Sequence, residues 1–492
     1  MYTNISAEHP LHTEYKGQWS LIRDCVAGDD AIKKGGTKYL PKLCRPSLDE
    51  ENAIYKSYQA RAFWVNFTGQ ALENIHGMIM RRHPTIDAPD MFKKSGILEN
   101  IDGRGTSLYQ FASDVMYDTI QTCFGGILAD IPAAPDGMTL AEAEEQGIRP
   151  YLRYYRAEDF INWREGGGNK GELRLVVLRE TYDDGSDMFV HTRRERYRLL
   201  MLDEDGYYVQ KLVTESKDRR GRTVWQEEHI DVRVNGERLR YIPFMPLPYD
   251  LPEKTMLYDM AKINIGHFQK TADYENAVHK TTLPTGWITG HNAIDEDGEQ
   301  EQIILGDDTF LTISEPEAKV GTLVFAGEGL LHSETAIRRA EEQMAVIGTR
   351  IIAPEKNVAE TAESGMVHMY GENGKMATFA RNMGERMSVA LTWIMNWCGY
   401  EGKARLDFDV DYETMRMDPN AINAIANLSR ENKFPLLCTF QVLQEQGYVD
   451  INYTYEDFIY LLELEGQGLT PMEVFDSFKA MRDRTSRMLP RG

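Results

Sequence analysis

Cysteine is scarce in this sequence, and the few cysteines present have no spacing typical of a framework or a metal site. The five residues are Cys25, Cys44, Cys123, Cys398 and Cys438; they include no CxxC pair and leave an odd count. This distribution indicates thiols in a reducing cytoplasm, without disulfides or a zinc site. The eleven histidines include no HExxH arrangement. We therefore expect no metal centre.

Long apolar runs and an export signal are also missing. No stretch of 18 apolar residues occurs, and the opening MYTNISAEHPLHTEYKGQW has no basic patch followed by an apolar run. We expect a protein that is neither secreted nor membrane-spanning. With 42% hydrophobic and 27% charged residues, the composition is that of a folded globular chain, and 492 residues suffice for two to four structural units.

Positive charge is in deficit. The chain has 55 lysines and arginines against 77 acidic residues, a net charge of −22. This is the wrong sign for a protein that holds nucleic acid tightly by neutralising phosphates. An acidic protein can still surround DNA, because like charge keeps the polyanion hydrated and away from the wall. The balance disfavours tight DNA binding and is compatible with a channel.

Signatures of catalysis are absent. The glycine-rich stretches GGGNKG, 166–171, and GENGK, 371–375, lack the GxxxxGK[ST] spacing of a phosphate-binding loop. There is no GxSxG elbow, and DEDGEQE, 295–301, does not fit the DxDxDG calcium loop. We expect no catalytic residue, no metal and no cofactor. A hydrolase without a recognisable motif is an alternative, with Glu227, Glu228 and His229 as its first candidates.

The spacing of apolar residues divides the first half of the chain into a helical and a β part. From Glu14 to about Ala133 apolar residues recur every three or four positions, and we expect one long helix from Tyr55 to Ile79. Between Pro150 and Pro248 the period becomes two, with Asp-Gly, Arg-Gly and Asn-Gly pairs between the runs. This alternation predicts an antiparallel sheet.

The second half has helical spacing on both sides of an acidic segment. An apolar stripe that includes Asn264 and His267 predicts a helix over 251–279, with Pro252 in its first turn. A second helix is expected over 333–347, with Ser333 as its N-cap. Between them, 283–331 holds ten acidic residues against one lysine, which is the sharpest charge feature of the sequence.

A polar break, VIGTRIIAPEKNVAETAESG at 346–365, follows the second helix. Gly348 and Pro354 interrupt the helical pattern there, and one long helix ending at Trp397 comes next. Beyond it we expect a strand in ARLDFDVDY and several short helices from Asp418 onward. Five of the residues between Lys479 and Gly492 are basic and one is acidic, so the end of the chain is basic.

This order of elements resembles that of the portal proteins of tailed bacteriophages. Two pairs of stretches are similar to portal segments: 15–43 with 55–79, and RAEEQMAVIGTRIIAPEKNVAETAESG with the helix ending ALTWIMNWCG. The resemblance implies an α+β, portal-like fold. Its parts would be a wing over 1–250, a first stem helix over 251–281, a clip over 282–332, a second stem helix over 333–348, a tunnel loop over 349–364, a long wing helix and strand over 365–412, a crown over 413–470, and a C-terminal helix and basic tail over 471–492.

The resemblance also implies a function without enzymatic activity. Portal proteins form a ring, usually a dodecamer, at the portal vertex of the capsid, where double-stranded DNA is packaged and later ejected without sequence-specific binding. The implied partners are the terminase large subunit, the major capsid and scaffolding proteins, and head-completion or adaptor proteins. The implied location is the virion, after assembly in the cytoplasm of the host bacterium. Another virion protein, such as an adaptor or minor head protein, is a further alternative.

The resemblance assigns candidate site residues to three regions. In the tunnel loop, facing DNA, they are Arg350, Glu355, Lys356 and Glu360. Along the stem lumen they are Lys254, Lys262 and Lys270, although each of these lysines is as well explained by a solvated helix face or a salt bridge between subunits. In the clip, at the partner-docking surface, they are Asp295, Glu296, Asp297, Glu299 and Glu301.

Overall fold

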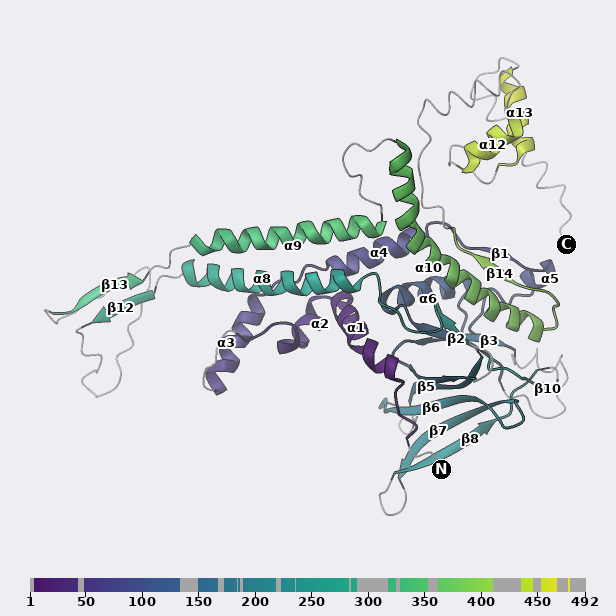
Figure 1. Ribbon diagram of the computed structural model, residues 1–492, viewed down its shortest axis with the longest axis horizontal. Coiled ribbons are helices and arrows are strands. Elements are labelled where there is room, and N and C mark those ends of the chain that lie inside the picture. The colour runs from purple at the N-terminus through teal and green to yellow at the C-terminus, as the bar shows by residue number, and fades with distance from the viewer. Residues whose placement is uncertain are drawn as a thin grey trace. The chain divides into compact units, whose positions relative to one another are not determined.

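A computed structural model of the chain (Figure 1) contains two compact units, Met1–Val410 and Asp411–Gly492. Helices and antiparallel sheets occur together in the first unit, so the α+β class is confirmed. The residues that the structure describes are 4–42, 48–132, 149–166, 172–183, 185, 189–217, 223–234, 236–282, 285–289, 317–323, 328–352, 362–409, 435–445, 453–466 and 477.

The first unit begins with helices. They are α1 (Pro10–Ala27), α2 (Asp29–Lys34), the 3-10 turn η1 (Gly36–Lys38), α3 (Leu48–Arg61), α4 (Phe67–Ile79), α5 (Asp90–Lys93) and α6 (Leu108–Thr122). The single helix expected from Tyr55 to Ile79 is wrong, because α3 ends and α4 begins inside that range. Asn66 starts the new helix: its Oδ1 accepts from the Gly69 amide at 2.8 Å and so satisfies one of the free N–H groups at the N-terminus of α4.

Two antiparallel sheets follow. A three-stranded sheet has the order β11 (Phe244–Leu247), β2 (Gly125–Asp130), β3 (Tyr151–Arg156). A five-stranded meander has the order β4 (Phe160–Glu165), β5 (Leu173–Asp183), β6 (Arg193–Leu202), β7 (Tyr208–Lys217), β8 (Thr223–Ile230). The predicted antiparallel sheet is confirmed. Gly206, with φ of 80°, forms one of its expected turns in the left-handed region that favours glycine.

Two details of this region differ from expectation. The strand β2 lies in a stretch expected to be helical, where its short all-buried run carries no alternation to distinguish it. The alternating stretch TVWQEEHIDVRV, 223–234, which reads as a single strand, is divided into β8 and β9 (Arg233–Val234), and β9 pairs with β10 (Glu237–Arg238) in a separate hairpin.

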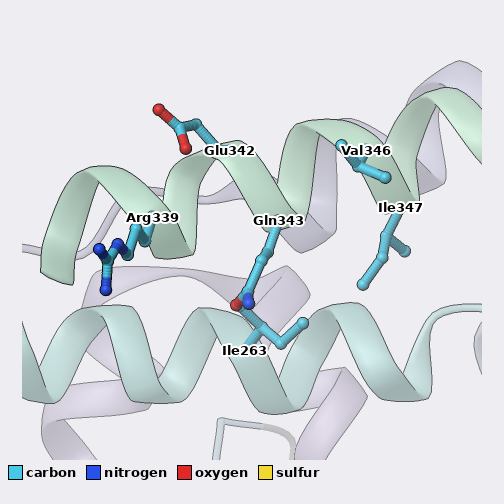
Figure 2. A pocket seen from close by; sticks show the side chains of 6 residues that line it. All are labelled: Ile263, Arg339, Glu342, Gln343, Val346 and Ile347. Atoms are coloured by element: carbon cyan, nitrogen blue, oxygen red, sulfur yellow. The ribbon is translucent and has the colours of Figure 1, made fainter.

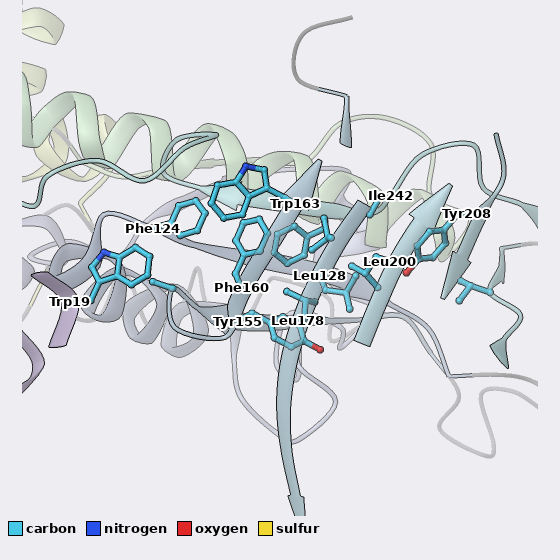
Figure 3. Packing of buried hydrophobic residues seen from close by; sticks show 14 residues of the cluster. Trp19, Phe124, Leu128, Tyr155, Phe160, Trp163, Leu178, Leu200, Tyr208 and Ile242 are labelled. Atoms are coloured by element: carbon cyan, nitrogen blue, oxygen red, sulfur yellow. The ribbon is translucent and has the colours of Figure 1, made fainter. Parts of the chain in front are cut away.

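Aromatic side chains form the core between α1 and the sheets (Figure 3). Phe124 stacks on Trp19 with ring centroids 5.9 Å apart and on Phe160 at 4.9 Å. The indole of Trp19 is fully buried and donates to the Thr122 carbonyl at 2.9 Å. Each such side chain contributes roughly 1.5–3 kcal/mol through burial. This core makes a rigid body from helices and strands that are far apart in the sequence.

Buried charges also join the two sheets. Glu180 on β5 accepts from Arg198 Nε on β6 at 2.7 Å and from the Tyr155 hydroxyl on β3 at 2.6 Å. Burial alone would raise the pKa of Glu180, but Arg198 and Arg153 outweigh it and lower the pKa to about 2. Arg198 also reaches Asp130 on β2 at 3.4 Å. The cluster fixes one sheet against the other.

A pair of long helices comes next, α8 (Tyr258–Thr282) and α9 (Glu328–Ile352), with the short strands β12 (Thr285–Thr289) and β13 (Lys319–Leu323) between them. The expected start of the first helix near Leu251 is wrong. Pro252, Thr255 and Leu257 are buried, so packing holds this segment against the body in a non-helical path. Pro252 is therefore outside the helix.

The expected limits of the second helix are also wrong. Helix α9 starts five residues before Ser333, whose hydroxyl donates to the Gly329 carbonyl at 3.3 Å within the helix and caps nothing. Gly348 lies inside the helix as well. The described helix extends to Ile352.

The long helix expected up to Trp397 is confirmed as α10 (Ala362–Trp397), followed by β14 (Arg405–Asp407), which pairs with β1 (Thr85–Asp87). Helix α10 and strand β14 meet closely at Gly384, where an added Cβ would lie 2.6 Å from the Leu406 carbonyl oxygen. Ser388 Oγ accepts from the Leu406 amide at 2.8 Å. A glycine is therefore required at this helix–strand contact.

The second unit contains two described helices, α12 (Leu436–Glu445) and α13 (Tyr455–Gly466). Phe440 packs against Phe458 with ring centroids 5.1 Å apart. Thr454 and Asp457 cap α13 reciprocally, each side chain accepting from the other's backbone amide at 3.2 and 2.9 Å. These helices belong to the range assigned to the crown, and the basic segment from Lys479 lies outside the described residues.

Candidate functional site

The candidate site is the pair of helices α8 and α9, which lie side by side (Figure 1). Each has 25 residues, so each is about 37 Å long. A Cβ on Gly348 would lie 3.6 Å from Met260, while His267 faces Glu341 further along, so the helices run in opposite directions. The short sheet of β12 and β13 connects their other ends.

The inner half of α8 is fixed to the body by a buried polar residue. Asn264 is fully buried, and its Oδ1 accepts from both the amide and the hydroxyl of Thr68 at 3.1 and 3.0 Å. Its amide group donates to the Val65 carbonyl at 2.9 Å. Because Thr68 is in the first turn of α4, Asn264 also satisfies a free N–H group at that helix terminus. One side chain therefore sets both the position and the rotation of α8.

Further contacts extend this anchorage as far as Asp273. The Tyr58 hydroxyl on α3 donates to Asp273 Oδ1 at 2.6 Å, and Gln269 Nε2 donates to the Tyr39 carbonyl at 2.8 Å. The ring of Phe268 meets Trp64 edge to face at 5.8 Å. Burial, followed by the Asp273 carboxylate, raises the pKa of Tyr58, so its hydroxyl remains a donor at physiological pH.

His267 links the two long helices. Its ring is 2% exposed, its Nε2 lies 3.3 Å from Glu341 Oε1 on α9, and Phe67 meets it edge to face at 5.6 Å. On α9, Ala340 and Met344 are buried on either side of this contact. The inner halves of both helices are thus packed on the body and on each other.

The outer halves of α8 and α9 are much less buried than the inner halves. Among the described side chains, none beyond Ala272 on α8 and none before Ala340 on α9 is buried. Leu331 is 68% exposed. In the adjoining sheet Trp287 is 43% exposed and Val320 56%, although a two-stranded sheet alone is marginal in water. This half of the helix pair lacks the packing that normally stabilises long helices.

A groove lies between the helices near the inner half (Figure 2). It has a volume of about 490 Å³ and is lined by Ile263 of α8 and by Arg339, Glu342, Gln343, Val346 and Ile347 of α9. Figure 2 shows Arg339, Gln343 and Ile347 of α9 pointing toward α8, where Ile263 lies, whereas Glu342 points away from α8. Such a surface fits the side chains of another helix.

The three candidate stem lysines do not all belong to α8. Lys254 lies before α8 in the non-helical segment, so it is not on the stem helix, and its Nζ pairs with Asp259 at 2.7 Å. Lys262 and Lys270 are exposed on α8, about 12 Å apart along its axis. The ammonium of Lys262 lies 4.5 Å from the centre of the Tyr258 ring.

The remaining predicted residues fall in or beside segments that the structure does not describe. The backbone of Arg350 belongs to α9, so this residue is not in a loop. Glu355, Lys356 and Glu360 lie outside the described residues. So do the five clip acids, Asp295, Glu296, Asp297, Glu299 and Glu301.

The residues of the alternative hydrolase site are exposed on a single strand. Glu227, Glu228 and His229 follow one another on the edge strand β8, where His229 Nε2 is 3.9 Å from Glu227 Oε2 and its side chain is 63% exposed. Within the described ranges, no three His, Cys, Asp or Glu side chains are placed to hold a metal ion. The helices of those ranges are each too short or too polar to cross a bilayer.

Residues 256–398, from α8 to the end of α10, match a family model described as a domain of unknown function, DUF4055. Comparison with the curated proteins gives no match. Among solved structures, the chain is similar to one from the virion of a native gene transfer agent particle, at 13% identity and a TM-score of 0.33, covering 82% of this chain and 92% of that one.

Two other chains come from particle necks. The neck of the native particle, computed with C12 symmetry, gives 12% identity and a TM-score of 0.31, covering 81% of this chain and 94% of that one. The neck of the empty particle, computed with C6 symmetry, gives 13% identity and a TM-score of 0.32. The match covers 86% of this chain and 99% of that one. TM-scores near 0.3 establish neither a shared fold nor a shared function.

Proposed function

We propose that this protein is a phage portal subunit. Copies would form a ring, usually of twelve, at one vertex of the capsid, and double-stranded DNA would pass through the ring during packaging and ejection. One observation carries the proposal: the outer halves of α8 and α9 have no buried side chain among those described, and they occur where the order of elements places the portal stem. Such helices need neighbours.

A ring supplies those neighbours without leaving an open end. Each copy would present the outer half of its helix pair to the next copy, and repeated head-to-tail contacts close when the rotation between copies divides the circle. Interhelical packing at 8–10 Å would then bury apolar residues such as Leu331. The anchored inner halves would hold every pair at the same angle.

The charges are compatible with DNA passage. The net charge of −22 per copy disfavours tight binding, and sliding requires weak contacts. Lys262 and Lys270 are the stem candidates for transient phosphate contacts. The segment around Lys356 would face the DNA as the tunnel loop, and the acidic segment 295–301 would dock the terminase large subunit and later the head-completion proteins.

Mass photometry of two matched variants tests the assembly. Leu331→Asp places a charge on the outer half of α9, and we expect it to shift the population from large oligomers to monomers. Met91→Asp makes the same type of change on α5 at a side chain 75% exposed and should assemble like wild type. Wild-type protein that stays monomeric at high concentration and across salt conditions contradicts the proposal.

The proposal includes no enzymatic activity. The hydrolase alternative is tested by an activity screen before and after His229→Ala, and activity lost in the variant would favour that alternative. An oligomer without a central channel would instead favour an adaptor or minor head protein.

A further inference from the structure

A second groove lies beside α10 and shares no lining residue with the groove between α8 and α9. It has a volume of about 610 Å³ and lies between the loop end of the β4–β5 hairpin, strand β11 and the middle of α10. Its floor is apolar and aromatic and is formed by Tyr241, Ile242, Phe244, Met245, Val389 and Trp393.

The floor is held firmly. The rings of Tyr241 and Trp393 lie 5.5 Å apart, and Trp397 Nε1 donates to the Tyr241 hydroxyl at 3.3 Å. Ile242 and Phe244 belong to the buried core, whereas Val389 is 39% exposed and offers an apolar surface to solvent. The groove can therefore take an apolar side chain without rearrangement of its walls.

The rim is acidic. Glu165, Glu172, Glu385 and Asp250 line the groove together with a single cation, Arg386. Arg386 is already engaged, because its guanidinium donates to Asp250 at 2.8 Å and to the Pro246 carbonyl at 3.2 Å. Among the described residues, Glu165, Glu172 and Glu385 make no ion pair, although the charge of Glu165 opposes the lowering of the His9 pKa by burial. With four carboxylates against one arginine, the lining of the groove carries a net negative charge.

We propose that this groove binds a positively charged, extended peptide segment that carries apolar side chains. The floor would take an apolar side chain, and lysine or arginine on either side of it would pair with the rim carboxylates. The groove is larger than one side chain needs, which favours a segment over a single residue. Nucleic acid is disfavoured by the three carboxylates, and the folded surface of a second copy is disfavoured by its net charge of −22.

The probe is a peptide whose composition meets both requirements. KAMRDRTSRMLPRG, the sequence of residues 479–492, has five basic residues, one acid, and apolar methionine, leucine and proline. A fluorescein-labelled copy is titrated with the full-length protein, and binding is followed by fluorescence anisotropy. A second peptide with every Lys and Arg replaced by Gln tests whether charge is needed.

Charge-reversal variants locate the binding. Glu172→Lys with Glu385→Lys should weaken binding of the basic peptide by about tenfold or more, since each rim charge pair contributes modestly. Glu204→Lys, at an exposed turn between β6 and β7, makes the same type of change outside the groove and should bind like wild type. Thermal melting confirms that the variants are folded, which is expected because all three side chains are exposed.

Three results overturn the proposal. In the first, the basic peptide does not bind to the wild-type protein. In the second, Glu204→Lys weakens binding as much as the groove variant does. In the third, the Gln peptide binds as tightly as the basic peptide. The inference does not depend on ring formation, so it can fail while the portal proposal stands, or stand while that proposal fails.

Discussion

Asn264 shows how a single buried polar side chain can control a long helix. Its three hydrogen bonds, to the Thr68 amide and hydroxyl and to the Val65 carbonyl, connect α8 to the start of α4 across nearly 200 residues of sequence. A polar residue within an apolar stripe is the only sequence signal for this role. Its partners could not be predicted, because they depend on how distant segments meet.

Asn264→Ala should therefore destabilise the protein by about 3 kcal/mol, because it leaves several buried polar groups without partners. Chemical denaturation followed by circular dichroism measures the change. Gln343→Ala, at an exposed position on α9, should change stability by less than about 0.5 kcal/mol. Equal effects of the two variants would show that Asn264 is not an anchor.

His12 makes the stability of the first unit depend on pH. Its ring is fully buried beside Trp19, and burial lowers its pKa below 6.5, although Glu8, 3.4 Å from Nδ1, opposes the shift. As the pH falls below 6.5 the unfolded chain binds a proton here before the folded chain does. This contribution to stability is complete above pH 6.5 and is lost as the pH falls from 6.5 through the lowered pKa.

Unfolding midpoints measured between pH 7.5 and 5 should therefore decline less steeply in His12→Leu than in wild type. Part of the decline in the midpoint should remain in this variant, because burial also lowers the pKa values of His9 and His76. His279→Leu, at an exposed position on α8, should keep the full wild-type slope. An unchanged slope in His12→Leu would exclude His12 as a source of acid sensitivity.

Among the elements, the strands of the meander were easier to predict than the ends of the helices. Alternating side chains and left-handed glycines such as Gly206 act locally, so the sequence alone reveals them. The start of α8 depends instead on burial of Pro252 and Leu257 against the body. The limits of α9 were mispredicted because Ser333 resembles a cap in sequence but lies inside the helix.

Gly384 is a second contact between elements that sequence could not reveal. Gly384→Ala should destabilise the protein by about 1–3 kcal/mol, because the new Cβ would lie 2.6 Å from the Leu406 carbonyl oxygen and force α10 and β14 apart. Gly77→Ala is the matched control in α4, where a Cβ meets nothing within 4 Å, and it should stabilise by about 0.5–1 kcal/mol. Denaturant titration of both variants provides the comparison, and stabilisation by Gly384→Ala would contradict the close contact.

At the scale of the whole molecule, the portal proposal depends on what lies next to each copy. The α+β class and the two long helices could be predicted from the sequence, whereas the division of the helix pair into anchored and unpacked halves required the structure. The loop and clip residues lie mostly outside the described ranges, so their roles are still predictions.

The structure sharpens the test of the tunnel loop, because Arg350 belongs to α9. Replacing 353–361 by a Gly/Ser segment of equal length leaves both flanking helices intact. We expect rings to assemble normally while the amount of DNA retained in packaged heads falls. Full-length packaged DNA, measured by gel electrophoresis of DNA from purified particles, would contradict a role for this segment in holding DNA.

The central claim is that copies of this chain close into a ring through α8 and α9. Negative-stain electron microscopy of the purified protein tests it most directly. The account predicts rings with a central channel, and their loss in Leu331→Asp but not in Met91→Asp. Single copies or irregular clusters without a channel, in wild-type protein at concentrations where it is folded, would contradict it.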